Sequence, residues 1–135
     1  LKEQHGTSII FITHDLGVIA ELCEKVEVMY GGLIMEEAPI DELFEHPSHP
    51  YTLGLLESMP SIQQDKAERL IPIPGSPPDM TNPPAGCPFA PRCRYARKIC
   101  AAELPELQPV GEGHSARCWL LDPEAPAEQN PFKKR

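Results

Sequence analysis

Four of the five cysteines lie in the second half of the chain, and they form the group most able to do chemistry: Cys87, Cys93, Cys100 and Cys118. In a reducing compartment, clustered thiols point to a metal or redox site rather than to structural disulfides. The spacing, C-x5-C-x6-C-x17-C, is wider than the close pairs of zinc ribbons. Three interpretations stay open: a [4Fe–4S] cluster, which the wide gaps favour, a structural zinc ion, or free or oxidised thiols.

A second candidate is His14, which follows the apolar run Ser8–Thr13 and precedes a helix that Asp15 is expected to open. Ligands of open α/β sheets bind beyond the carboxyl ends of the strands, where a histidine can contact a phosphate or orient a water. The alternative is a strand-end histidine bonded to a neighbouring carbonyl.

Structural roles suit His46, His49 and Cys23 better. His46 and His49 adjoin prolines in a turn, which favours capping or surface positions. His114, four residues before Cys118, is the one plausible substitute ligand. Cys23 shares a helical face with Leu16, Ile19 and Ala20 and is most simply a small core residue.

The net charge of −8 is unevenly distributed. Residues 1–86 hold 4 basic and 14 acidic side chains, residues 87–118 hold 5 and 3, and the rest hold 3 and 3, which gives −10, +2 and 0. An acidic body argues against a nucleic-acid surface. The basic side chains among the cysteines suit compensation of thiolate charge: Arg92, Arg94, Arg97, Lys98 and Arg117.

The elements that must position these residues change character along the chain. Ser8–Thr13 is apolar on both faces, as a central parallel strand would be. Gly31-Gly32 between two short apolar runs predicts a hairpin, and short helices are expected over residues 40–44 and 51–59. From Pro60 onward lie 14 of the 17 prolines, so we expect almost no strands there. Such a segment needs a cross-link to hold a shape, and bound metal is one.

Four segments of the chain resemble a known family. Residues 8–39 are similar to the switch-histidine stretch of ABC transporter nucleotide-binding subunits. Residues 46–56, 73–80 and 84–93, which include His46-Pro-Ser-His-Pro-Tyr and Gly86-Cys-Pro-Phe-Ala-Pro-Arg-Cys, resemble the C-terminal extension of oligopeptide, dipeptide and nickel importers. The resemblance runs from Leu1 to about Leu121.

This resemblance implies that His14 contacts the γ-phosphate of ATP and links it to the attacking water, with ATP and Mg²⁺ as cofactors of the full-length subunit. It also implies permease subunits and a second ATP-binding subunit as partners, on the inner face of the cell membrane. The chain shows no G-x-x-x-x-G-K-[ST] loop, so we expect a fragment that is inactive by itself. The alternative function is a metal-binding interaction or redox-sensing module.

The fold class expected is α/β: the C-terminal part of an ABC-type nucleotide-binding domain with a small proline-rich, metal-stapled extension. The expected division is a domain fragment over 1–60, a linker over 61–86, the four-cysteine extension over 87–121 and a disordered tail over 122–135. No apolar run approaches the roughly 20 residues needed to span a bilayer, and no signal peptide is recognisable. We therefore expect a cytoplasmic chain with no direct membrane insertion.

Overall fold

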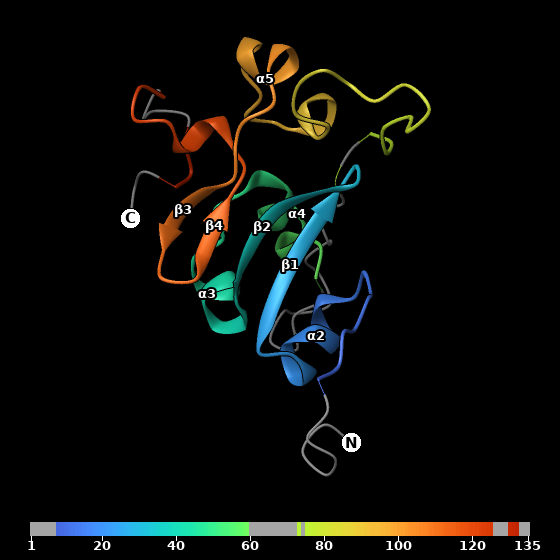
Figure 1. The fold of residues 1–135 in the computed structure, drawn as a ribbon, viewed down its shortest axis with the longest axis vertical. Coiled ribbons are helices and arrows are strands. Elements are labelled where there is room, and N and C mark those ends of the chain that lie inside the picture. The colour runs from blue at the N-terminus through green and yellow to red at the C-terminus, as the bar shows by residue number, and fades with distance from the viewer. Residues whose placement is uncertain (1–7, 60–72, 74, 126–129, 133–135) are drawn as a thin grey trace, which may run out of the picture.

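The computed structural model describes residues 8–59, 73, 75–125 and 130–132. Its centre is a four-stranded antiparallel sheet in the order β1–β2–β4–β3 (Figure 1). The strands are β1 (Lys25–Tyr30), β2 (Leu33–Pro39), β3 (Gln108–Gly111) and β4 (His114–Ala116). The sheet therefore joins a hairpin from the first third of the chain to a hairpin from near its end.

The first hairpin has the predicted turn. Gly31 and Gly32 connect β1 to β2 with φ of 58° and 80°, the left-handed conformation that a tight two-residue hairpin requires. Along β1, buried and exposed side chains alternate, so Val26, Val28 and Tyr30 face the core. A register shift at Val28/Met29 marks a bulge in the pairing with β2.

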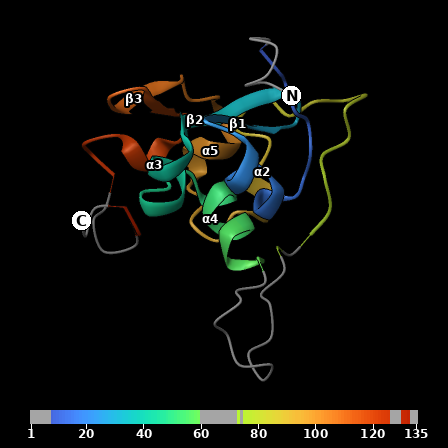
Figure 2. The same ribbon diagram turned by 90° about the horizontal axis from the view of Figure 1, so that it is seen from below.

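Three helices cover one face of the sheet, as Figure 2 shows edge-on: α2 (Leu16–Leu22), α3 (Ile40–Glu45) and α4 (Pro50–Glu57). Asp15 caps α2 by accepting hydrogen bonds from the backbone N–H groups of Gly17 and Val18, as predicted. A hydrocarbon core lies between these helices and the sheet and buries the following side chains: Leu16, Ile19, Val26, Val28, Ala38 and Leu43. None of the described helices is long and apolar enough to cross a membrane.

The expectation of a strand over Ser8–Thr13 is wrong for this structure. These residues form no strand, and the side chains of Ile10 and Ile12 are 91% and 92% exposed. An extended segment becomes a strand when a neighbour pairs with its N–H and C=O groups, and no described residue does so here. The sheet that does form is antiparallel instead of parallel.

The proline-rich segment, expected to form almost no strands, contributes two short ones to the sheet. β4 pairs with β2 through Glu36–Ala116 and Glu37–Ser115, and β3 pairs with β4. Pro109 is tolerated because β3 is the edge strand of the sheet, where one side of the backbone needs no ladder partner. The second half of the chain thus extends the sheet of the first.

The cysteine-bearing segment lies beyond the β1–β2 turn, at the top of Figure 1. It contains a 3₁₀ turn over Ala90–Arg92, the short helix α5 (Lys98–Ala102) and a second 3₁₀ turn over Trp119–Leu121. Three aromatic rings join it to the first half, because Phe89 packs 5.3 Å from Tyr30 and 5.2 Å from Tyr51, between ring centroids. Tyr30 and Tyr51 are themselves 4.7 Å apart.

Two described residues of the expected tail are packed. Asn130 is buried and its side-chain amide donates a hydrogen bond to the Leu120 carbonyl at 2.7 Å, and Ala125 is also buried. The tail differs from the expected disorder at these positions. Of the expected linker over 61–86, residues 61–72 and 74 lie outside the described residues.

Candidate functional site

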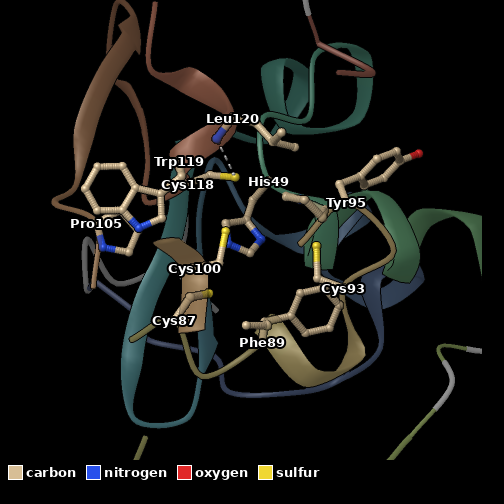
Figure 3. Close-up of a pocket in the computed structure, with 12 residues that line it drawn as sticks. His49, Cys87, Phe89, Cys93, Tyr95, Cys100, Pro105, Cys118, Trp119 and Leu120 are labelled. Carbon is tan, nitrogen blue, oxygen red and sulfur yellow. Dashed lines mark hydrogen bonds between the residues drawn. The ribbon is translucent and has the colours of Figure 1, made fainter. Parts of the chain in front are cut away.

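The four cysteines that the spacing singled out line a single cavity (Figure 3). The cavity is otherwise largely apolar, with walls formed by Phe89, Tyr95, Pro105, Trp119 and Leu120 among others. Trp119 lines the cavity and is fixed by a hydrogen bond from Nε1 to the Glu103 carbonyl at 2.8 Å. All four thiols are free of disulfide bonds.

Separate short elements bring the thiols together. Cys93 ends the first 3₁₀ turn, Cys100 lies within α5, and Cys118 follows β4 as the cap of the second turn. Cys87 is tied to α5 by a backbone hydrogen bond from its N–H to the Cys100 carbonyl at 2.7 Å. A Cβ on Gly86 would lie 2.2 Å from that carbonyl oxygen, so only glycine allows this approach.

Backbone N–H groups point at two of the four sulfurs. The Leu120 N–H donates to Cys118 Sγ at 3.4 Å, and the Arg97 N–H donates to Cys100 Sγ at 3.3 Å. The backbones of Phe89 and Ala90 act to lower the pKa of Cys87, and the backbone of Tyr95 acts to lower the pKa of Cys93. Hydrogen-bond donors to sulfur stabilise the thiolate relative to the thiol, and the thiolate is the form that binds metal.

Burial has the opposite effect on the thiols. It raises the pKa of Cys93 to about 11 and that of Cys118 to about 12, and it also raises the pKa of Cys87. Each of these rises is increased by the neighbouring cysteines, because thiolates sharing one cavity repel one another. With nothing to balance their charge, these three cysteines stay protonated at neutral pH.

The arginines of this segment do more than balance charge. Arg117 and Arg94 counter the pKa rise that burial causes at Cys87 and Cys93, respectively, in keeping with the expected compensation. Arg117 also donates to the carbonyls of Ile34 and Pro105, at 3.1 and 3.0 Å. Arg94 pairs with Glu57 of α4. These side chains therefore fasten the cysteine segment to the sheet and helices.

The cavity suits a metal by its donor chemistry but does not present a finished ligand set. Four soft thiols are the ligands that bind zinc and iron–sulfur clusters. Its free volume of about 20 Å³ exceeds what one water-sized occupant needs. In the part of the chain that the structure describes, however, no three His, Cys, Asp or Glu side chains are placed to hold a metal ion.

His49 is a residue of this cavity that the sequence reasoning did not assign to it. As expected it caps a helix: its Nδ1 accepts a hydrogen bond from the Tyr51 N–H at 3.0 Å, at the start of α4. It is not at the surface, however, because the residue is 1% exposed and its ring lines the cavity with the thiols (Figure 3). The His-Pro-Tyr sequence signals the cap, but nothing local signals the cavity.

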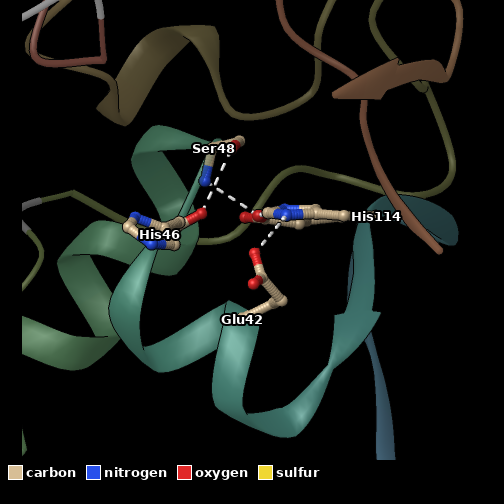
Figure 4. A network of polar contacts seen from close by, with 5 residues as sticks. Glu42, His46, Ser48 and His114 are labelled. Carbon is tan, nitrogen blue, oxygen red and sulfur yellow. Dashed lines mark hydrogen bonds and ion pairs between the residues drawn. The ribbon is translucent and has the colours of Figure 1, made fainter. Parts of the chain in front are cut away.

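His114, the expected substitute ligand, belongs to a different site. Its Nε2 lies 2.5 Å from Glu36 Oε2, and the same oxygen accepts the Ser48 N–H at 2.8 Å (Figure 4). Glu42 approaches Nδ1 at 3.9 Å. Burial raises the pKa of Glu36, although His114 and the nearby Thr52 hydroxyl favour its charged form. The pair links β2 to β4, and His114 does not line the cysteine cavity.

The other two sequence candidates lie apart from the cavity. His14 is exposed in the bend before α2 and is not among the lining residues. Cys23 packs against the hydrocarbon core at the end of α2, as its helical position predicted. The structure therefore brings together the cysteine quartet but leaves His14 outside that site.

Comparison with known proteins identifies the segment that carries three of the cysteines. Residues 35–100 match the family described as the oligopeptide/dipeptide transporter, C-terminal region. The chain is also 50% identical over 131 residues to the oligopeptide transport ATP-binding protein OppD of Bacillus subtilis, a match that covers 97% of the chain. The resemblance seen in the sequence is thereby confirmed.

Other relatives agree. The dipeptide transport ATP-binding protein DppD of Lactococcus lactis is 50% identical over 126 residues, covering 93% of the chain. A probable peptide ABC transporter ATP-binding protein of Sinorhizobium fredii is 46% identical over 119 residues, covering 88%. The matches span only 36–37% of the length of these relatives. The mixed helix-and-sheet fold is that of a C-terminal region of such a subunit.

Proposed function

We propose that this chain is the C-terminal part of the ATP-hydrolysing subunit of an ABC importer for peptides, with nickel as the less favoured cargo. The observation that carries the proposal is the 50% identity to an oligopeptide transport ATP-binding protein over 97% of the chain. In this proposal ATP and Mg²⁺ bind to the complete subunit, which works with a second ATP-binding subunit and with permease subunits at the inner face of the membrane. The chain by itself hydrolyses no ATP, because it contains no phosphate loop.

The role proposed for His14 is contact with the γ-phosphate and the attacking water. Its exposure in the bend before α2 is compatible with this role, because a side chain that meets nucleotide held elsewhere must be accessible. The test is His14→Ala in the complete subunit. We expect turnover to fall by roughly 10²–10³-fold, the usual cost of removing one transition-state contact, with little change in ATP affinity. Equal losses of affinity and turnover would contradict the role.

The proposed division of the chain follows from its two sites. Residues 1–60 end the nucleotide-binding domain, residues 61–86 connect it to the four-cysteine extension over 87–121, and residues 122–135 form the tail. The extension docks on the domain through the β2–β4 pairing and the aromatic contacts of Phe89. A docked extension is suited to stabilise the domain or to contact its partners.

The cysteine cavity is proposed to hold a [4Fe–4S] cluster, with zinc as the alternative. The N–H donors to the sulfurs of Cys100 and Cys118, and the backbone groups that lower the pKa of Cys87 and Cys93, support this, since they favour thiolates. A bound cluster supplies a cross-link and one-electron chemistry. Protein purified without oxygen should be brown and contain about four irons and four sulfides per chain. Colourless protein with one zinc would replace the cluster by zinc, and metal-free protein from metal-replete cells would exclude both.

The alternative is a metal-binding interaction or redox-sensing module, in which the cavity matters without nucleotide. The observation that favours it is the separation of the quartet from His14, which does not line the cavity. If the metal senses redox state, ATP turnover of the complete subunit should change between the oxidised and reduced forms. Equal turnover in both forms would leave the metal with a structural role.

A further inference from the structure

The most informative unexplained atom of the molecule is His49 Nε2. It is buried, and it has no hydrogen-bond partner among the described residues. An unsatisfied buried donor or acceptor costs about 1–3 kcal/mol, so such an atom calls for an explanation. Its position in the wall of the cysteine cavity supplies one, because whatever occupies the cavity would meet it.

The tautomer of His49 follows from its other nitrogen. Nδ1 accepts a hydrogen bond from the Tyr51 N–H at 3.0 Å, so Nδ1 carries no proton. An imidazole whose Nδ1 offers its lone pair carries its proton on the other nitrogen, so the proton of His49 lies on Nε2. Nε2 is therefore a donor and not a metal ligand, because a ligating nitrogen must offer a lone pair.

The competing acceptor is the backbone of Arg117, which acts on the ring to raise its pKa. The contact between Nε2 and the Arg117 backbone is too poor in geometry to count as a hydrogen bond, so Nε2 remains without a partner. The other groups that line the cavity are mainly apolar rings and the four sulfurs. Sulfur is the acceptor that gains most from a donor once it becomes a thiolate or sulfide.

We propose that His49 is a positioning residue of the cysteine site, whose Nε2–H donates a hydrogen bond to sulfur when the site is loaded. This rests on the proposed metal occupancy of the cavity. His49 also caps α4, so the hydrogen bond ties the site to a helix of the main core. Hydrogen bonds to the sulfurs of a cluster stabilise its more negative, reduced state and thereby raise its potential.

Two substitutions separate the two nitrogens of the ring. In His49→Asn the side-chain oxygen can replace Nδ1 as the helix cap, since Asn is among the best capping residues, but nothing reaches the position of Nε2. In His49→Gln the longer amide can replace the Nε2 donor, but the cap is lost. A structural role in capping predicts that His49→Gln is the more harmful change, and a role at the sulfur site predicts the reverse.

The experiment loads the full chain anaerobically with iron and sulfide, measures iron per chain, and then titrates the visible absorption against potential. We expect His49→Asn to bind iron but to shift the oxidised-to-reduced ratio about tenfold at a fixed potential, which is a midpoint 59 mV lower for a one-electron couple. His49→Gln should stay close to wild type. Equal midpoints for wild type and His49→Asn would overturn the role of His49 while leaving the cluster in place.

The remaining outcomes also decide between the two proposals. If the wild type binds zinc only, Co²⁺ replaces zinc as the probe, and an unchanged thiolate-to-cobalt absorption in His49→Asn overturns the hydrogen bond. Wild-type protein that takes up neither metal overturns the proposed occupant and, with it, the acceptor for His49. In the metal-free wild type, long-range ¹H–¹⁵N correlation should show the proton on Nε2, and a proton on Nδ1 would contradict the assignment.

Discussion

Around residues 16–59 the chain is held by hydrocarbon packing, with Ala38 and Leu43 fully buried between sheet and helices. Residues 86–121 are held differently: by a glycine-permitted backbone contact, by the Arg117 hydrogen bonds and by N–H donors to sulfur. Among the described residues, the first region leaves three buried side-chain atoms without a hydrogen-bond partner: Glu36 Oε1, His49 Nε2 and Thr52 Oγ1. The second region instead places three protonated thiols around the cavity that His49 also lines. The difference indicates that the second region is shaped around an occupant.

The largest expected effect tests that occupant directly. Cys118→Ser should remove essentially all bound metal, because it deletes one of four ligands at the most strongly enclosed thiol of the site. Elemental analysis of anaerobically prepared protein measures the metal content. Cys23→Ser is the matched control, since Cys23 packs against the hydrocarbon core instead of lining the cavity, and it should keep full loading. Full loading of Cys118→Ser would show that the cavity does not hold the metal.

The next effect concerns the hydrocarbon core. Leu43→Ala should lower the free energy of unfolding by about 2–5 kcal/mol, because the fully buried side chain leaves a cavity between α3 and the sheet. Urea titration of the metal-free and loaded chains measures this loss. Leu22→Ala is the control, since Leu22 is 62% exposed and should change stability by no more than about 0.5 kcal/mol. A loss of similar size in both variants would mean that this core is not packed as described.

Gly86→Ala probes the contact specific to the second region. The added Cβ would press on the Cys100 carbonyl and on the Ala101 backbone, so we expect a loss of about 1–3 kcal/mol and weaker metal binding. Gly111→Ala is the control, because its Cβ would meet only His114 Cβ, at an ordinary 3.7 Å. Urea titration combined with metal analysis distinguishes them. If Gly86→Ala bound as much metal as the wild type, the close backbone contact between Cys87 and Cys100 would not be needed for metal binding.

The same contrast explains how far the sequence could predict the fold. Local signals placed the α2 cap at Asp15, the Gly31-Gly32 turn and the capped helix at His49, because each depends on residues a few positions apart. The pairing of β4 with β2 joins residues about 80 positions apart, and no local pattern encodes it. Proline content misled the strand prediction, since an edge strand tolerates Pro109.

The candidate site shows the same limit. The type and number of the cysteines predicted that they would lie together. They come from separate turns, however, so the sequence could not show that His49 lines the same cavity. Glu36 was missed for another reason: the bulge at Val28/Met29 breaks the alternation of β2, so that Met35 and Glu36 are both buried. An alternating pattern would have placed one of the two in solvent.

Glu36 gives the smallest predicted effect, which is a dependence of stability on pH. Burial raises its folded-state pKa above the ordinary value of 4.5, although His114, Thr52 and the Ser48 N–H favour the carboxylate. The folded chain therefore binds this proton more tightly than the unfolded chain does. The resulting stabilisation is fully present below about pH 4.5 and is lost as the pH rises through the folded pKa, with a slope of at most about 1.4 kcal/mol per pH unit.

Glu36→Gln keeps the size of the side chain and leaves an amide that does not titrate, so it should flatten the stability profile above pH 4.5. Because the Glu36 carboxylate pairs with His114, which Glu42 also approaches, the difference between the two profiles reports on the coupled Glu36–His114 pair. Urea titrations from pH 4 to pH 8 measure it. Parallel profiles would show that Glu36 titrates alike in the folded and unfolded chains. The Glu36–His114 contact between β2 and β4 would then make the docking of the second region no more stable at one pH than at another.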